Sequence, residues 1–163
     1  MQNSQKKKCV FAGTFDPLTL GHEKLVQDCL ELFDEVVVAL LINPAKEPYF
    51  TVAEREEMLR IAFGAQSRVK IVSFTGTVCA LLQKENTKIY VRGIRNGVDL
   101  DYENANFYAS KKLDKDLIAV YLPCPQELLH ISSSMVRNSL KFHTPIDEYL
   151  SPNIKAYIQG LGK

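Results

Sequence analysis

The most informative segment of the chain runs from Thr14 to His22 and reads Thr-Phe-Asp-Pro-Leu-Thr-Leu-Gly-His. It follows a short apolar run at residues 9–13 and precedes a segment with helical spacing. Backbone N–H groups in the first turn of a helix lack helical partners, and the helix dipole favours negative charge there. Gly21 lets a ligand come close to the backbone, and His22 adds a side-chain donor. The stretch therefore predicts a phosphate-binding site in a protein that handles a nucleotide.

Short apolar runs alternate with amphipathic segments along the rest of the chain. The runs are rich in Val and Ile, which is typical of parallel strands covered on both faces. They lie at residues 8–13, 35–42, 69–74, 89–92 and 117–122. Stripes with helical spacing lie around residues 25–33, 58–63, 78–82, 100–113, 135–140 and 154–161. We expect one α/β domain over residues 1–163: a Rossmann-like, doubly wound, five-stranded parallel sheet with helices on both faces.

Two helix starts have specific signals. Thr51 and Glu54 have the spacing of a capping box, and Ser151 before Pro152 is typical of a cap followed by a first-turn proline. In a doubly wound sheet, ligands bind at the carboxyl ends of the strands, where the strand order reverses. The segment at residues 43–50, which holds Lys46, is predicted to be a surface loop.

Composition excludes several classes of function. The chain has 163 residues, 20 Lys and Arg and 19 Asp and Glu, so no basic excess favours a nucleic-acid partner. No apolar run is long enough to span a membrane, and the N-terminus lacks the apolar region of a signal peptide. The four cysteines lie in apolar segments without metal-ligand spacing: Cys9, Cys29, Cys79 and Cys124. We therefore expect buried thiols, a cytoplasmic protein, and no membrane partner.

Four clusters at predicted strand ends or helix starts could donate hydrogen bonds to anionic oxygen. The first is the stretch from Thr14 to His22, and the second is Lys46. The third is Arg92-Gly93-Ile94-Arg95, with Glu103 further along the chain. The fourth is Ile131-Ser132-Ser133-Ser134, followed by Arg137. All four map to one edge of the predicted sheet, and this shared position favours a function over chance.

Each cluster also has a structural interpretation. His22 could begin a helix without binding anything, and Lys46 could be an ordinary surface lysine. Arg92 and Arg95 flank a glycine where the chain is expected to turn, and both could form surface ion pairs. The serines could be only an N-cap, and Glu103 a solvated helix charge. Asp16 is expected to be a turn residue that holds its own loop, and two further histidines are taken as structural: His130 and His143.

Several catalytic motifs are missing from the sequence. It has no Gly-x-x-x-x-Gly-Lys-Ser/Thr loop and no Gly-x-Gly-x-x-Gly fingerprint. His22-Glu23 lacks the second histidine of a zinc protease, since position 26 is Val, and no Gly-x-Ser-x-Gly elbow occurs. The candidate site is therefore rich in phosphate donors and poor in nucleophiles and general bases, and we name no residue as a metal ligand.

The motifs together resemble a known family. Thr19-x-Gly21-His22 is similar to the T/H-x-G-H signature of the nucleotidyltransferase superfamily. With Arg92-Gly93-Ile94-Arg95, Asp101-Tyr102-Glu103 and Ile131 to Ser134, the chain resembles the bacterial phosphopantetheine adenylyltransferases from about residue 8 to about residue 155. That family transfers the adenylyl group of ATP to 4′-phosphopantetheine and releases pyrophosphate, giving dephospho-coenzyme A.

The resemblance implies roles for individual residues. His22 and Lys46 would be catalytic. The acceptor would be bound by Thr14, Lys46, Val78 and Arg92. ATP would be bound by Thr14, Phe15, His22, Gly93, Ile94, Arg95, Glu103, Leu128, Ile131, Ser132, Ser133 and Ser134. The family also implies Mg²⁺, a homohexamer and feedback inhibition by coenzyme A.

Three positions depart from the family pattern: Ala12 in place of proline, Thr77-Val78-Cys79 in place of a Leu-rich run, and Leu128 in place of an aromatic residue. Two alternatives stay open. One is a related adenylyl- or cytidylyltransferase with another phosphorylated acceptor, such as nicotinate mononucleotide, and the other is a non-catalytic nucleotide sensor on the same fold. A class I aminoacyl-tRNA synthetase fragment is disfavoured, because the chain is short and lacks a Lys-Met-Ser-Lys-Ser motif.

Overall fold

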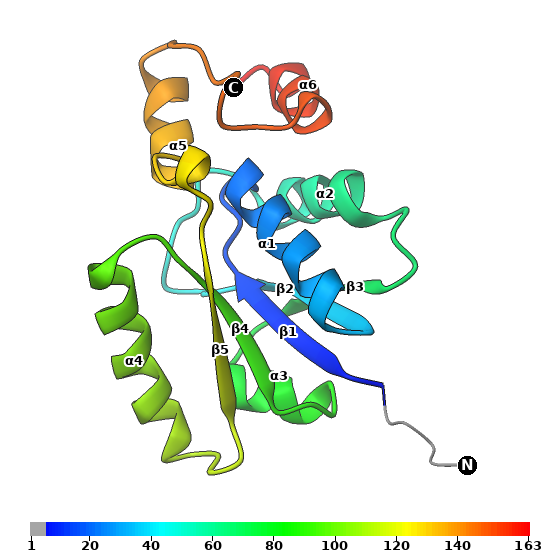
Figure 1. The fold of residues 1–163 in the computed structure, drawn as a ribbon. Helices are drawn as coiled ribbons and strands as arrows, with labels where there is room; N and C mark the ends of the chain where they lie inside the picture. The colour runs from blue at the N-terminus through cyan, green and yellow to red at the C-terminus, as the bar shows by residue number, and fades with distance from the viewer. Residues whose placement is uncertain (1–5) are drawn as a thin grey trace.

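Five parallel strands form one sheet in the computed structural model, which describes residues 6–163 (Figure 1). The strands are β1 (Lys8–Gly13), β2 (Glu35–Leu41), β3 (Val69–Phe74), β4 (Ile89–Ile94) and β5 (Ile118–Pro123). Their order is β3-β2-β1-β4-β5, and every pair is parallel. The doubly wound α/β fold expected from the sequence is therefore confirmed.

Six α-helices connect the strands and follow the last one. They are α1 (Leu20–Leu32), α2 (Val52–Phe63), α3 (Val78–Lys84), α4 (Gly97–Lys111), α5 (Ser133–Lys141) and α6 (Pro152–Gly160), with a short 3₁₀ turn η1 (Gln126–Leu128) before α5. Among residues 6–163, no helix is both long enough and apolar enough to cross a membrane. Helices α5 and α6 lie beyond the carboxyl end of the sheet (Figure 1).

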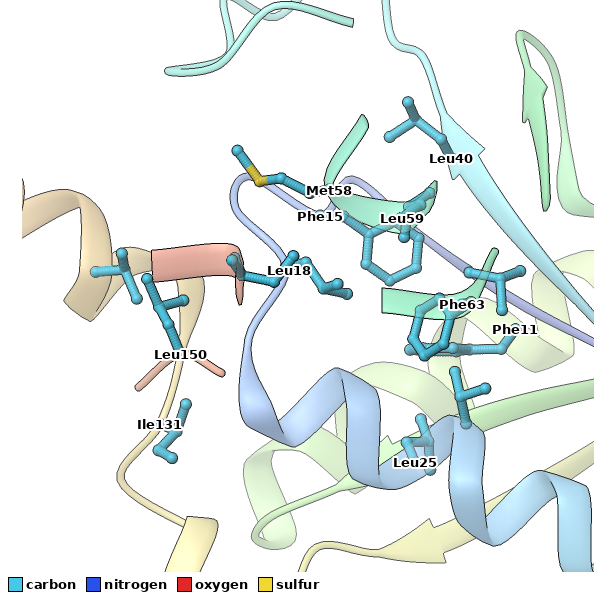
Figure 2. Close-up of a cluster of buried hydrophobic side chains, with 14 of the residues drawn as sticks. Phe11, Phe15, Leu18, Leu25, Leu40, Met58, Leu59, Phe63, Ile131 and Leu150 are labelled. Atoms are coloured by element: carbon cyan, nitrogen blue, oxygen red, sulfur yellow. The ribbon is translucent and has the colours of Figure 1, made fainter. Parts of the chain in front are cut away.

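The side-chain alternation of the central strands divides the core into two layers. Cys9 and Phe11 of β1 belong to the layer that also contains residues of α1, α2, α5 and α6. Figure 2 shows Phe11 in this layer with Leu25 of α1 and Phe63 of α2. Val10 and Ala12 point to the opposite layer, with Leu81 and Leu82 of α3. Because both faces are covered, β1 and β2 are almost continuously buried, as their apolar sequence predicts.

The strand order reverses between β1 and β4. From β1 the chain winds outward through β2 and β3, and then it returns to the other side of β1 with β4 and β5. The two crossovers leave this point in opposite directions, so the loop after β1 and the loop after β4 diverge and leave a crevice between them. The predicted phosphate-binding stretch and the predicted arginine cluster follow these two strands.

Several predicted boundaries differ from the structure by one to three residues, and two of these differences have a clear physical cause. Strand β4 was expected to end at Arg92 with a turn at Gly93, but it continues to Ile94 because Gly93 and Ile94 pair with Leu122 and Pro123 of β5. A Cβ at Gly93 would lie 3.3 Å from the Leu25 side chain, so glycine serves close packing against α1 here.

Helix α4 begins earlier than expected. The predicted start was residue 100, but the helix begins at Gly97 because the Asn96 side chain caps it and accepts a hydrogen bond from Asp99 N at 2.9 Å. Gly97 and Val98 are weak helix formers, which hid this start in the sequence. The capping box of Thr51 and Glu54 is confirmed.

Burial also differs from expectation at the sheet edges. Strands β3 and β5 are mostly half-buried, because each has a neighbouring strand on only one side. Cys9, Cys29 and Cys79 are buried free thiols, as predicted, whereas Cys124, directly after β5, is only half-buried.

Candidate active site

His22 is held in one orientation by the start of α1. Its ring Nδ1 lies 3.1 Å from the Thr19 backbone nitrogen and 3.0 Å from the Thr19 hydroxyl. Since the backbone N–H can only donate, Nδ1 accepts that bond, and the neutral ring then has its proton on Nε2. The Phe15 ring packs edge-on against the imidazole at 5.1 Å between centroids. His22 therefore presents an N–H donor from a fixed ring.

The environment of His22 keeps the imidazole neutral. Burial, followed by the positive charges of Arg92 and Arg95, lowers the pKa of His22 from 6.5 to about 4. At pH 7 the ring is thus an uncharged hydrogen-bond donor in the free protein. It can stabilise charge on a phosphate oxygen, and it is poorly suited to accept a proton at this pH.

A pH titration can test this assignment. In the ¹H–¹⁵N NMR spectrum of the free protein, we expect the His22 ring to titrate near pH 4. The unfolded chain binds this proton below about pH 6.5, so the free energy of unfolding should fall as the pH drops from about 6.5 to 4. The fall should be smaller in His22→Gln, and a His22 ring that titrates near 6.5 would contradict the assignment.

Arg92 lies at the switch point and is fixed by three hydrogen bonds. Its Nε and Nη2 donate to Oε1 of Glu103 at 2.9 and 2.7 Å, and its Nη1 donates to the Ala12 carbonyl of β1 at 2.7 Å. Glu103 is only 8% exposed, so the expectation of a solvated helix charge was wrong. The pair joins α4 to the sheet and points a guanidinium between the ends of β1 and β4.

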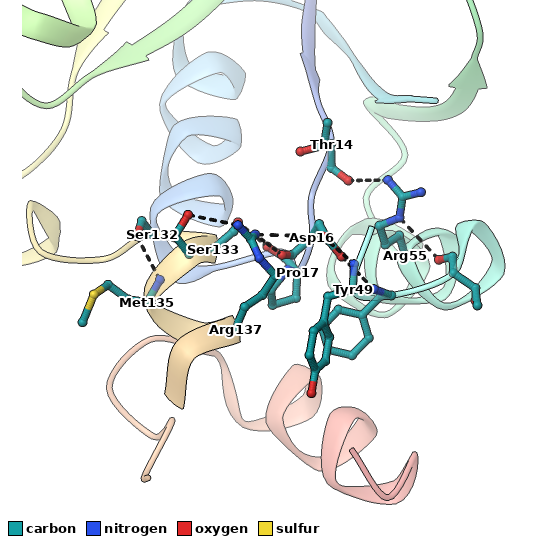
Figure 3. Close-up of polar contacts among 12 residues, drawn as sticks. Thr14, Asp16, Pro17, Tyr49, Arg55, Ser132, Ser133, Met135 and Arg137 are labelled. Carbon is teal, nitrogen blue, oxygen red and sulfur yellow. Dashed lines mark hydrogen bonds and ion pairs between the residues drawn. The ribbon is translucent and has the colours of Figure 1, made fainter. Parts of the chain in front are cut away.

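The arginines and serines also have the structural partners that the sequence left open. Arg95 pairs with Asp99 on the exposed start of α4, at 3.0 Å between Nε and Oδ2. Ser132 caps α5 by accepting from Met135 N, and Ser133 donates to the Pro17 carbonyl at 2.7 Å (Figure 3). The N-cap interpretation is therefore correct for Ser132, and it brings the start of α5 against the loop that follows β1.

Two cavities meet at the switch point. The first, of about 320 Å³, lies between the starts of α1 and α5. Of the residues predicted to bind ATP, nine line this cavity: Thr14, Phe15, His22, Gly93, Arg95, Glu103, Ile131, Ser132 and Ser133. Two helix N-termini thus border one space, which favours an anion such as a triphosphate.

The second cavity, of about 460 Å³, lies on the opposite face of the sheet, beside α3 and α4. Val78 lines it, as expected for a residue that contacts the acceptor. Thr14, Arg92 and Glu103 line both cavities. Two molecules bound in the two spaces would therefore meet beside the hydroxyl of Thr14 and the guanidinium of Arg92.

Some predicted site residues lie outside both cavities: Lys46, Ile94, Leu128 and Ser134. Lys46 is exposed in the loop after β2, and Leu128 packs against the core. The Phe15 side chain is 1% exposed, so a ligand could reach this residue mainly through its backbone. A Cβ at Gly21 would meet only Thr19 Oγ1 at 3.7 Å, so the protein itself does not require glycine where the first cavity opens.

The sequence suggested that Asp16 holds its own loop, but its carboxylate binds a different segment. Its two carboxylate oxygens accept hydrogen bonds from the backbone nitrogens of Tyr49 and Phe50, at 2.9 and 2.8 Å (Figure 3). The partners lie 33 and 34 residues further along the chain, so no local sequence pattern could have revealed them.

Sequence reasoning also missed much of the second cavity. Its aromatic and amide side chains come from β4, β5 and α4: Tyr90, Tyr102, Asn106, Phe107 and Tyr121. Tyr102 and Asn106 are four residues apart on α4, so helical spacing could have placed them on one face with Glu103. The Tyr121 hydroxyl is buried, and it has no hydrogen-bond partner among the described residues.

The fold and the paired cavities define a nucleotide-handling α/β protein, and comparisons with known proteins narrow the class. Residues 10–139 match the Cytidylyltransferase-like family. The phosphopantetheine adenylyltransferase of Heliobacterium modesticaldum is 35% identical over 147 residues, covering 90% of this chain and 88% of the relative. The enzymes of that name from Symbiobacterium thermophilum and Wolinella succinogenes are 37% and 36% identical, covering 89% and 94% of this chain and 90% and 95% of the relatives. The chain belongs to the Cytidylyltransferase-like family of nucleotidyltransferases, and within it to the phosphopantetheine adenylyltransferases.

Proposed function

We propose that this protein transfers the adenylyl group of ATP to 4′-phosphopantetheine, giving dephospho-coenzyme A and pyrophosphate. The structural observation that carries the proposal is the meeting of two cavities at Thr14 and Arg92, at the carboxyl ends of β1 and β4. An adenylyl transfer needs two polyanionic substrates to meet at one phosphorus atom. The relatives that share most of the chain carry the name of this activity.

The first cavity suits the triphosphate of ATP. His22 contributes its Nε2–H, and Ser132 and Ser133 begin a helix whose N-terminus attracts negative charge. Arg95 adds a positive charge at the rim, although it also pairs with Asp99. The imidazole, the backbone N–H groups at the start of α5 and the guanidinium can all donate to phosphate oxygens, so the cavity supplies charge stabilisation without a nucleophile of its own.

The second cavity suits an arm that is apolar along its length and has amide and hydroxyl groups. Val78 and Leu117 supply apolar surface, whereas Asn106 and Tyr121 supply polar atoms. The pantetheine arm has this mixed chemistry, with its phosphate at one end. With the arm in this cavity, the phosphate would lie near Arg92, beside the α-phosphate of ATP.

The reaction needs positioning more than proton transfer. An oxygen of the acceptor phosphate, already anionic at pH 7, attacks the α-phosphorus of ATP, and a new P–O bond forms. The bond from that phosphorus to the bridging oxygen of the β-phosphate breaks, and pyrophosphate leaves with the bonding electron pair. The fixed His22, Thr14 and Arg92 would align the two phosphates and stabilise the charge that grows in the transition state.

Lys46 is proposed to neutralise the acceptor phosphate. We expect Lys46→Ala to raise KM for 4′-phosphopantetheine about tenfold and to leave KM for ATP within about twofold, because a point charge near one substrate is lost. Steady-state kinetics measures both KM values, and calorimetry measures the Kd of each substrate. Lys115→Ala, an exposed lysine at the opposite end of the sheet, is the matched control. Equal losses for both substrates would contradict this role.

Several further properties are proposals from the family. We propose that Mg²⁺ enters with ATP as part of the co-substrate, as the family resemblance implies. Exposed apolar side chains on α4, including Val98, Tyr102 and Tyr108, support a homo-oligomer such as a hexamer. Coenzyme A shares the adenine nucleotide and the pantetheine arm with the two substrates, so it would compete as a feedback inhibitor. We also propose that the reaction takes place in the cytoplasm.

An acceptor screen tests the proposed activity. Pyrophosphate release from Mg·ATP is measured with 4′-phosphopantetheine, with nicotinate mononucleotide, and with pantetheine that lacks the phosphate. We expect pyrophosphate release with 4′-phosphopantetheine and not with the other two acceptors. Release with nicotinate mononucleotide instead would indicate a different nucleotidyltransferase, and ATP binding without turnover on any acceptor would indicate a nucleotide sensor.

A further inference from the structure

The loop after β1 is tied to the segment that contains Lys46 by one buried carboxylate. Asp16 is 8% exposed, and both of its oxygens are used: Oδ2 accepts from Tyr49 N and Oδ1 accepts from Phe50 N. Phe50 is fully buried in the core, so these bonds end the segment at a rigid point. Charge-assisted bonds of this kind are stronger than bonds between neutral groups.

The segment is also fixed where it begins. The Asn43 side chain accepts from Ala45 N at 2.9 Å, and the Asn43 carbonyl accepts from Lys46 N at 3.1 Å. Residues 43–48, which include this turn, are exposed, and the bonds to Asp16 follow them directly. The position of Lys46 therefore depends on the Asn43 turn and on the hydrogen bonds to Asp16. Of these two, only the bonds to Asp16 connect the segment to the rest of the site.

The loop that contains Asp16 is itself clamped from two sides (Figure 3). Arg55 of α2 donates to the Thr14 carbonyl at 2.9 Å, and Arg137 of α5 donates to the Asp16 carbonyl at 2.6 Å. The Arg137 guanidinium also lies 4.0 Å from Oδ2 of Asp16. Asp16 thus connects three parts of the site: the loop with Thr14, the start of α5, and the segment with Lys46.

We propose that Asp16 is a positioning residue for the acceptor phosphate, which it serves by fixing the Lys46 segment to the loop that contains Thr14. The inference rests on the proposed role of Lys46. It gives the carboxylate a function beyond stabilising a turn, because it sets the distance between the two groups that would contact the same phosphate.

The test is a double-mutant cycle of Asp16→Asn and Lys46→Ala, measured as KM for each substrate. Asparagine has nearly the same shape as aspartate, but it has one acceptor oxygen and presents an NH₂ group to the second backbone N–H. We expect Asp16→Asn alone to raise KM for 4′-phosphopantetheine about tenfold and to change KM for ATP by less than about threefold. In the Lys46→Ala background, the same change should raise KM for 4′-phosphopantetheine by less than about twofold.

Two further measurements separate positioning from a loss of stability. Glu85→Gln removes a buried carboxylate that pairs with Lys70 at the opposite end of the sheet, so it should lower the Tm without changing KM for the acceptor. Trypsin cleavage after Lys46 reports on the segment directly. It should be about tenfold faster in Asp16→Asn than in the parent and in Glu85→Gln, because local opening becomes easier.

The outcomes distinguish the two proposals. If Lys46→Ala leaves KM for 4′-phosphopantetheine unchanged, the role of Lys46 fails, and the inference about Asp16 fails with it. If Lys46→Ala raises this KM while Asp16→Asn has no effect, or has its full effect in both backgrounds, only the positioning role of Asp16 is overturned.

Discussion

Replacing His22 with alanine should lower kcat with ATP and 4′-phosphopantetheine by at least about 100-fold, because it removes a preorganised N–H donor from the first cavity. Loss of one such donor typically costs about 2.7–4 kcal/mol of transition-state stabilisation. The ring is held by Thr19 and Phe15, so little reorganisation is needed when charge develops on the phosphate. The measurement is steady-state kinetics at saturating substrates, with circular dichroism to verify the fold.

Two further variants show whether the effect comes from the lost N–H donor of His22. His22→Gln keeps an N–H donor on a more flexible side chain, so we expect an intermediate kcat. His130→Ala is the matched control, since His130 is exposed and its nearest carboxylate oxygen, from Glu148, is 3.9 Å away. Turnover near the parent value in His22→Ala would remove His22 from the mechanism.

Replacing Arg92 should affect stability and activity together. Arg92→Ala leaves the buried carboxylate of Glu103 without its partner, and breaking such a pair typically costs about 3–5 kcal/mol. That is a large part of the stability of an ordinary domain. We also expect a loss of at least about tenfold in kcat/KM for 4′-phosphopantetheine, because a charged donor to its phosphate is lost. Urea unfolding and steady-state kinetics measure the two effects.

A double variant separates the two effects of Arg92. Arg92→Gln with Glu103→Gln removes both charges, so most of the stability should return while the activity stays low. Arg60→Gln is the control for losing an arginine in an exposed ion pair, which is typically worth less than about 1 kcal/mol. If the double variant recovered normal kcat/KM, Arg92 would have only a structural role.

The sequence predicted the architecture well, because local patterns determine it. The Val- and Ile-rich runs identified all five strands, and the alternation with helical stripes indicated a parallel sheet. The start of α2 followed from Thr51 and Glu54, whose side chains act within one turn. The start of α4 was missed because Gly97 and Val98 are weak helix formers after the Asn96 cap.

The candidate site was only partly predictable for the same physical reason. His22 and Arg92 could be placed together, because the carboxyl ends of β1 and β4 meet at the switch point. The partners of Asp16, and the Ala12 carbonyl that binds Arg92, lie far away in the sequence, and only packing brings them into contact. The second cavity combines side chains of α4, β4 and β5 whose individual patterns indicate only core and surface.

The fate of the ATP phosphorus atoms shows whether this protein transfers the adenylyl group. The protein is incubated with 4′-phosphopantetheine and Mg·ATP labelled with ³³P at either the α- or the γ-position, and the products are separated. We predict that the α-label appears in dephospho-coenzyme A and the γ-label in pyrophosphate. Label from the γ-position in the acceptor product, or no labelled acceptor product from α-labelled ATP, would contradict an adenylyl transfer.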